Sequence, residues 1–254
     1  MNILDDIVAT KRAEVEDAKK RAPLETLVPR PRTSGRFVFL FETGPVLIAE
    51  IKPKSPSEGA LIERSPLDIA DLYAKSGADV ISVLTDSTYF GGSLALLEDV
   101  RAHVPQLLLR KDFIIDPYQV HETAASSADV FLLIASILQT DELRSLRELG
   151  ESFGLDALIE VHDEADIEKA LASGARVIGI NNRDLTKMET DLATTERLAH
   201  MIPRSIPLVS ESGIHQSGDV ERVRKAGARG ILVGTSILRS ENPLEHISEL
   251  KKSL

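Results

Sequence analysis

Lysines and carboxylates stand at the ends of several short apolar runs in this sequence, where they could transfer protons. Glu50 and Lys52 lie at the end of VLIAEI, Lys111 follows LLLR, and Glu160 lies near the end of DALIEV. An ammonium group donates protons and a carboxylate accepts them, so these residue types suit general acid–base catalysis. Other polar or small residues end further runs in the same way: Asp86, Asp112, Asn181, Arg183, Glu211, Ser212, Gly234 and Thr235.

The spacing of these charges groups them with apolar residues of the same strand. Alternate side chains of a strand point to the same side, so Lys111 shares a side with Leu109 and Glu160 shares a side with Leu158. If that side faces the axis of a barrel, lysines and carboxylates from three strands converge. The alternative is a set of structural ion pairs at the barrel rim. Four such charges together at strand ends favour a functional site.

Two later segments have the composition of a phosphate site. ESGI over 211–214 and VGTSIL over 233–238 contain small residues, which leave backbone N–H groups accessible to an anion. Many barrels bind phosphate at the loops after their seventh and eighth strands. Ordinary turn chemistry is the alternative, but the position of both segments favours phosphate.

Other catalytic classes lack their residues. The chain has no cysteine, no H-E-x-x-H, no G-x-S-x-G and no P-loop, so we expect neither thiolate chemistry nor a metal site. Of six scattered histidines, only His162 and His215 lie near strand ends. We interpret all six as structural or exposed, with His162 the one open case.

Alternating elements must position these residues. Continuous runs rich in Val, Ile and Leu predict strands buried on both faces, which is typical of a parallel sheet. Apolar residues three and four apart predict helices over 67–76, 94–103, 140–153, 164–173, 192–201 and 217–226. The predicted strands begin near Val46, Val80, Leu107, Val130, Asp156, Val177, Pro207 and Ile231.

Eight strand–helix units predict an α/β protein with a single (β/α)8 barrel, since about 250 residues are typical of that fold. An open doubly wound sheet is the main competitor, and the missing G-x-G-x-x-G turn disfavours it. We assign residues 46–254 to the catalytic barrel and 1–45 to an N-terminal helical extension with an amphipathic helix over 4–20. This extension either plugs the bottom of the barrel or covers its mouth.

Composition limits partners and location. The 254 residues are 43% hydrophobic and carry a net charge of −10, which would repel a nucleic acid. The N-terminus carries acidic residues within its first apolar patch, so it is neither a signal peptide nor a membrane span. We therefore expect a cytoplasmic protein with no membrane or nucleic-acid partner, and the sequence leaves the oligomeric state open.

Seven segments in order along nearly the whole chain resemble indole-3-glycerol phosphate synthases. They are IAEIKPKSPSEG (48–59), VLTDSTYFGGS (83–93), LLRKDFIID (108–116), ALIEVH (157–162), IGINNRDL (178–185), VSESGI (209–214) and ILVGTSIL (231–238). The resemblance implies a carboxy-lyase of tryptophan biosynthesis. Such an enzyme converts 1-(2-carboxyphenylamino)-1-deoxyribulose 5-phosphate to indole-3-glycerol phosphate, CO2 and water, without a cofactor.

The resemblance also implies a role for each matching residue. Lys111 corresponds to the general acid of ring closure, Glu160 to a carboxylate assisting dehydration, and Lys52 to a cation beside Glu50. Nearby cations and partial burial would lower the pKa of Lys111. Asn181, Arg183 and Glu211 match substrate-positioning and catalytic residues. The phosphate would lie near Lys52, Ser55, Ser212, Gly213, Gly234 and Thr235, and the aromatic ring near Pro56, Phe90, Phe113, Leu132 and Ile134.

Two other functions compete with this reading. Phosphoribosylanthranilate isomerase shares the expected fold and uses a related substrate, but that family works with a Cys/Asp pair and this chain has no cysteine. A non-catalytic phosphometabolite sensor would keep the barrel and lose the chemistry. The presence of Lys52, Lys111 and Glu160 together speaks against such a sensor.

Overall fold

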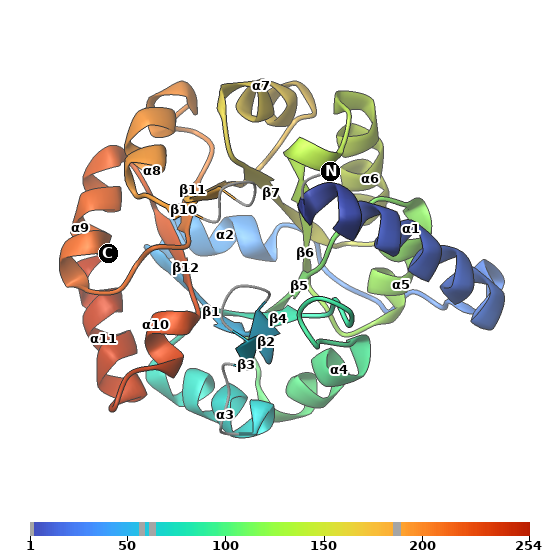
Figure 1. Ribbon diagram of the computed structural model, residues 1–254, viewed down its shortest axis with the longest axis horizontal. Coiled ribbons are helices and arrows are strands. Elements are labelled where there is room, and N and C mark those ends of the chain that lie inside the picture. Colours follow the sequence, from blue (N-terminus) through green and yellow to red (C-terminus); the bar gives the residue numbers. More distant parts are fainter. Residues whose placement is uncertain (1–2, 56–58, 61–64, 185–188) are drawn as a thin grey trace.

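Eight parallel strands close into a barrel in the computed structural model, which describes residues 3–55, 59–60, 65–184 and 189–254 (Figure 1). Around the barrel the strands neighbour one another in the order β1-β12-β11-β8-β7-β6-β5-β4. The predicted (β/α)8 barrel is therefore confirmed. The barrel strands are β1 Val46–Ile51, β4 Val80–Leu84, β5 Leu107–Lys111, β6 Val130–Ile134, β7 Asp156–Val161, β8 Ile178–Asn181, β11 Leu208–Glu211 and β12 Gly230–Val233.

Alternation along the strands divides the apolar residues into two layers. Ile48, Leu109 and Leu158 lie in the cluster inside the barrel, while their neighbours Leu47 and Leu108 pack outward against the helices. Both faces are thus buried, as the continuous runs predicted. The starts of three strands differ from prediction by one residue, and β11 begins after Pro207 because proline has no N–H for the strand ladder.

Helices form the outer ring that covers the strands (Figure 1). Side-chain caps fix several helix starts, as where Ser93 accepts a hydrogen bond from the Leu96 N–H. Three further helices, α5, α10 and α11, were not singled out by apolar spacing. The ring comprises α3 Pro66–Ser76, α4 Leu94–His103, α5 Pro117–Ala125, α6 Thr140–Ser152, α7 Glu164–Ala172, α8 Ala193–Leu198, α9 Ser217–Ala226, α10 Thr235–Leu238 and α11 Pro243–Ser253, with 3-10 turns η2 Ala135–Ile137 and η3 Ala199–Met201.

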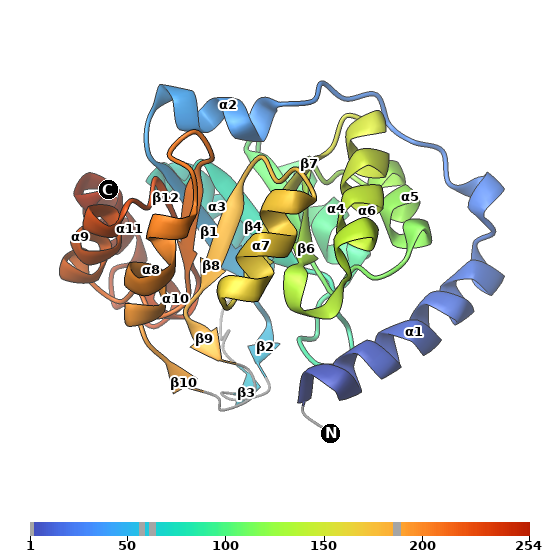
Figure 2. The same cartoon turned by 90° about the horizontal axis from the view of Figure 1, so that it is seen from above.

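The residues before β1 form α1 Ile3–Arg21, the 3-10 turn η1 Leu24–Thr26 and α2 Arg36–Thr43. Figure 2 shows α2 at one end of the barrel and the start of α1 at the other. Phe37 and Phe41 of α2 pack into the interior cluster beside the strand starts, while Ile3 and Ile7 of α1 line a cavity at the strand ends. The extension thus does both things that the sequence left as alternatives: α2 plugs the bottom and α1 reaches the mouth.

Two short hairpins extend the barrel on the side where the strands end. β2 Lys54–Ser55 pairs with β3 Gly59–Ala60, and β9 Arg183–Asp184 pairs with β10 Glu189–Thr190. They follow β1 and β8 directly and lie at the same end as the start of α1 (Figure 2). Among the described residues, no helix combines the length and apolar character needed to cross a membrane.

Candidate active site

One cavity at the carboxyl ends of the strands collects the charges that the sequence placed at strand ends. The inward side of each strand continues from the interior cluster into this cavity, so the charges converge on the barrel axis. The same charges also form ion pairs with one another. The two alternatives that the sequence offered, convergence on the axis and ion pairing at the rim, therefore occur together. The polar lining includes Glu50, Lys52, Lys111, Glu160, Asn181, Arg183, Glu211 and Ser212.

Lys111 is the centre of the ionic part of this cavity. Its Nζ atom lies 2.9 Å from Oε2 of Glu160 and 3.5 Å from Oε2 of Glu211. Burial alone would lower the pKa of Lys111, but Glu160, Glu211 and Glu50 outweigh burial and raise it above the usual value. The expected lowering is therefore wrong, because carboxylates rather than cations surround the ammonium group. Lys111 stays protonated and is available as an acid.

The pKa values of the two carboxyl groups next to Lys111 shift in opposite directions. Burial raises the pKa of Glu160, but Lys111 more than offsets it and holds that pKa below its usual value. Burial likewise raises the pKa of Glu211, and there Glu160 and Glu50 add to the effect despite Lys111. Paired carboxyl groups with separated pKa values can act as base and acid in one site. Glu160 is thus the ionised member, and Glu211 holds a proton more readily.

The position of Glu211 depends on a residue that the sequence did not single out. A Cβ atom on Gly179 of β8 would lie 2.1 Å from Oε1 of Glu211, closer than atoms can approach. Gly179 therefore provides the space that the carboxyl group occupies. At the end of β1, Lys52 Nζ lies 3.1 Å from Oε1 of Glu50, and both side chains are largely buried.

The residues expected at the phosphate share the same cavity. Ser212 and Gly213 have positive φ angles of 64° and 80°, a conformation that turns the chain sharply after β11. Gly234 and Thr235 line the cavity where β12 passes into the short helix α10. Ser55 lies in β2, close in sequence to Lys52, but its side chain falls outside the description.

The remaining wall of the cavity is apolar. The rings of Phe90 and Phe113 lie 6.0 Å apart, and Leu132 and Ile134 of β6 lie on the same cavity. Pro56, the fifth residue expected here, falls outside the described residues. An apolar wall facing an ionic wall is suited to a ligand with an aromatic ring at one end and anionic groups at the other. Within the described ranges, no group of three or more His, Asp or Glu side chains is arranged to hold a metal ion.

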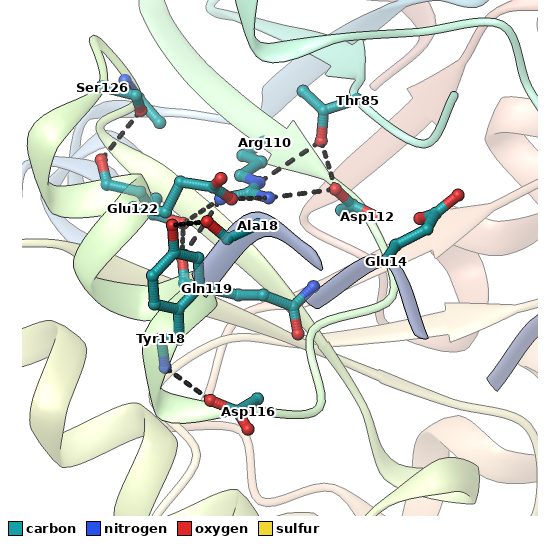
Figure 3. Close-up of polar contacts among 12 residues, drawn as sticks. Glu14, Ala18, Thr85, Arg110, Asp112, Asp116, Tyr118, Gln119, Glu122 and Ser126 are labelled. Carbon is teal, nitrogen blue, oxygen red and sulfur yellow. Dashed lines mark hydrogen bonds and ion pairs between the residues drawn. The ribbon is translucent and has the colours of Figure 1, made fainter. Parts of the chain in front are cut away.

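A network of polar contacts around Arg110, the residue before Lys111, lies beside α1, and Tyr118 joins the two by donating to the Ala18 carbonyl of that helix (Figure 3). The guanidinium of Arg110 donates to Asp112 over 3.1 Å and to Glu122 over 2.7 Å, and Thr85 donates to Asp112 over 2.7 Å. Arg110 and Asp112 flank Lys111 in the chain, so this network fixes the backbone on both sides of the ammonium group.

Lys11 of α1 completes that network and was missed in the sequence. Its Nζ atom lies 2.8 Å from Asp86 and 3.1 Å from Asp112, and only 4% of the residue is exposed. Lys11 stands four residues from both Ile7 and Val15, on the apolar face of the helix. A lysine four residues from two apolar residues lies on the buried face of a helix, and this pattern in the sequence could have indicated a buried cation.

A closed barrel of eight parallel strands, with the ammonium groups of Lys52 and Lys111 among carboxylates at its strand ends, defines an enzyme of the (β/α)8 class. The fold resembles that of thiamine phosphate pyrophosphorylase from Pyrococcus furiosus, with a TM-score of 0.61 over 84% of this chain and 96% of that one. At 17% sequence identity, this likeness concerns the fold alone.

Sequence comparison supplies the family. The model of the family described as indole-3-glycerol phosphate synthase matches residues 4–250. Relatives named indole-3-glycerol phosphate synthase from Roseiflexus sp. (strain RS-1) and Shouchella clausii (strain KSM-K16) are 47% and 44% identical, each over 98% of this chain and 97% of the relative. The chain belongs to the indole-3-glycerol phosphate synthase family. It is a carboxy-lyase of tryptophan biosynthesis, as the motifs predicted.

Proposed function

We propose that the cavity at the barrel mouth converts 1-(2-carboxyphenylamino)-1-deoxyribulose 5-phosphate to indole-3-glycerol phosphate, CO2 and water, with Lys111 as the acid of ring closure. The observation that carries the proposal is the contact of the Lys111 ammonium group with Glu160 at 2.9 Å and Glu211 at 3.5 Å. In this contact a protonated amine lies next to an ionised carboxylate and next to a second carboxyl group that can hold a proton. The reaction needs donors and acceptors of this kind.

Ring closure begins when the ring carbon that carries the carboxylate attacks the ketone. The carbon–oxygen double bond opens, and its oxygen takes a proton from Lys111 to become a hydroxyl group. The raised pKa of Lys111 keeps its amine protonated until ring closure begins. The transfer is then driven by the alkoxide that forms, which is a stronger base than the Lys111 amine. Lys52, which contacts Glu50, serves in this proposal as the cation for the carboxylate and the phosphate of the substrate.

The later steps follow from the intermediate. The cationic ring nitrogen accepts the electron pair released as the carboxylate leaves as CO2, so the ring supplies its own electron sink. Dehydration then removes the new hydroxyl group as water and a proton from the adjacent CH2 group. Glu160 accepts that proton as the ionised carboxylate, and a protonated carboxyl group such as Glu211 assists departure of water. Asn181, which donates to Glu160 over 3.2 Å, orients this base.

Binding is divided between the two walls of the cavity. Arg183, Ser212, Gly213, Gly234 and Thr235, together with Ser55 and Lys52, hold the phosphate and substrate oxygens. Phe90, Phe113, Leu132 and Ile134, with Pro56, hold the aromatic ring. Residues 46–254 form the catalytic domain, and the extension 1–45 covers its mouth through α1. A net charge of −10 and the lack of cysteine fit a cytoplasmic enzyme of small anionic metabolites that binds no nucleic acid.

A direct assay tests the proposal. The purified protein is mixed with the carboxyphenylaminodeoxyribulose phosphate, and indole fluorescence and released CO2 are followed together. We expect one CO2 for each indole-3-glycerol phosphate formed, with no added cofactor. Absence of indole-3-glycerol phosphate, or its formation without matching CO2, would contradict the proposed reaction.

A further inference from the structure

His162 lies between two carboxylates directly after β7. Its Nε2 atom is 3.3 Å from Oε1 of Glu160, and its Nδ1 atom is 3.7 Å from Oδ2 of Asp166 in α7. The side chain is 17% exposed, and neither ring nitrogen forms a hydrogen bond within the described part of the chain. Buried polar groups are usually hydrogen-bonded, so an imidazole in this state calls for an explanation.

Two cavities meet at this histidine. Glu160 lines the active-site cavity, whereas His162 and Asp166 line a second, polar cavity of about 480 Å³. A water molecule occupies roughly 30 Å³ in the liquid, so the second cavity has room for several. His162 therefore lies between the base of the active site and a second space that water can fill, although Asn181 and Arg183 line both cavities.

Charge balance in the proposed reaction creates a need for such a connection. The substrate carboxylate is anionic and leaves as neutral CO2, so each turnover takes up one proton. Lys111 loses a proton in ring closure and must regain one. The bound substrate occupies the mouth of the active-site cavity, which leaves the opposite side of Glu160 as the route for that proton.

We propose that His162 returns this proton to Lys111 through Glu160 after ring closure and before dehydration, while Glu160 is still ionised. The proton that Glu160 later takes from the CH2 group then replaces, by way of Lys111, the proton that Glu211 gives to the departing water. The imidazolium gives its Nε2 proton to Oε1 of Glu160, and the carboxyl group, after turning, delivers a proton to the Lys111 amine that it contacts at 2.9 Å. The neutral ring keeps its proton on Nδ1, so it must turn to take up a new proton at Nε2 from water in the second cavity, and it then returns to its place beside Asp166. His162 acts through Glu160 and does not touch the substrate, so it is a positioning residue. This inference rests on the function proposed above.

The charges around His162 favour this direction of transfer. Burial lowers the pKa of His162, but Asp166 and Glu160 outweigh burial and raise the pKa above its usual value. Lys111 is the stronger base, so a proton that leaves His162 for Lys111 moves downhill. The charged groups around His162 and its cavity are Glu160, Asp163, Asp166, Lys169, Arg183, Asp184, Glu189, Asp191, Arg197 and Glu211.

Proton uptake measured in a single turnover tests the relay. His162→Gln keeps a donor near Glu160 but cannot exchange a proton. Enzyme in excess over substrate is followed with a pH-indicator dye, while quenched samples report substrate loss. We expect substrate loss at nearly the wild-type rate and proton uptake slowed by roughly 10-fold or more, as for loss of an acid–base group. Equal slowing of both signals, or no lag in proton uptake, would overturn the relay.

Two controls separate the relay from other causes. His103→Gln removes an exposed histidine that lies 3.2 Å from Asp71, and it should leave both signals unchanged. If His162→Gln does not fold, the wild-type enzyme still gives the answer: proton uptake should lag behind substrate loss as pH rises through the pKa of His162. A lag that does not depend on pH would refute the relay. Failure of the wild-type enzyme to form indole-3-glycerol phosphate would instead refute the proposed function.

Discussion

Lys111 Nζ lies 2.9 Å from Oε2 of Glu160, so an ion pair joins the end of β5 to the end of β7 across the intervening strand β6. Only 2% of the Glu160 side chain is exposed. When one member of a buried pair is removed, the other is left as an uncompensated charge, which is strongly destabilising. Substitutions of Lys111 or Glu160 should therefore keep the size and shape of the side chain and remove only its charge or its proton.

The buried pairs of Lys11 with Asp86 and Asp112 hold α1 at the mouth, so Lys11→Met should release the start of this helix. We expect KM to rise on the order of 10-fold. A buried pair broken on one side costs about 3–5 kcal/mol, and here that cost weakens the packing of α1 against the mouth of the barrel. Steady-state kinetics and hydrogen exchange of the α1 amides measure the effect.

Lys19→Met is the matched control on the same helix. Lys19 lies 2.9 Å from Asp116, but 35% of its side chain is exposed. Exposed pairs contribute about 1 kcal/mol or less, so KM should stay close to that of the wild-type enzyme. An unchanged KM for Lys11→Met, together with a lowered Tm, would mean that α1 serves stability alone.

Acid should weaken the fold through Asp112. Burial raises the pKa of this carboxyl group, but Arg110 and Lys11 outweigh burial and lower it from 3.8 to about 2. A lowered pKa gives stability that is present above the unfolded value and is lost as pH falls through the folded one. Between pH 4 and pH 2, the free energy of unfolding should fall by on the order of 2 kcal/mol more in the wild type than in Asp112→Asn.

Urea unfolding at several pH values checks this difference. Asp141→Asn is the control, since the Asp141 side chain is 88% exposed beside Arg144. Its stability should follow the pH dependence of the wild-type protein. Parallel curves for wild type and Asp112→Asn would show that the Arg110–Asp112–Lys11 network does not carry the acid sensitivity.

Gly179→Ala should displace Glu211, because the added methyl group would lie 2.1 Å from its Oε1 atom. We expect kcat to fall by about 10²-fold, the typical result of misplacing a catalytic group by 1 Å. Gly218→Ala in α9 is the control: no atom lies within 4 Å of the new methyl group, and alanine favours helix. A Gly179→Ala enzyme of normal kcat would remove Glu211 from the mechanism.

The barrel was predictable from sequence because its signals are local. VISVL and VFLLI are continuous apolar runs with both faces buried, and nothing but a parallel sheet covered by helices accommodates eight of them. The grouping of the charges in one site could be predicted too, because the carboxyl ends of parallel strands meet at one end of the barrel. Helix α5 was harder to predict, because it is only nine residues long and few of its side chains are apolar.

The pairings at the mouth could not be predicted, because they depend on which strands face each other across the axis. Lys111 meets Glu160 and Glu211 from distant parts of the chain, and these carboxylates, together with Glu50, reverse the direction of its pKa shift. Lys11 reaches Asp86 across 75 residues. The partners of His162 lie close in sequence, but the second cavity beside it exists only in the folded protein.

The division of proton transfers between Lys111 and Glu160 is the central claim, and rapid-quench analysis of single turnovers tests it most directly. Lys111→Met should lower the rate by roughly 10²-fold to 10⁴-fold, with no intermediate, because ring closure loses its acid. Glu160→Gln keeps shape and removes the base, so ring closure and CO2 release should proceed and a decarboxylated, still hydroxylated species should build up. Near wild-type turnover by Lys111→Met, or both variants stalling at the same species, would contradict the claim.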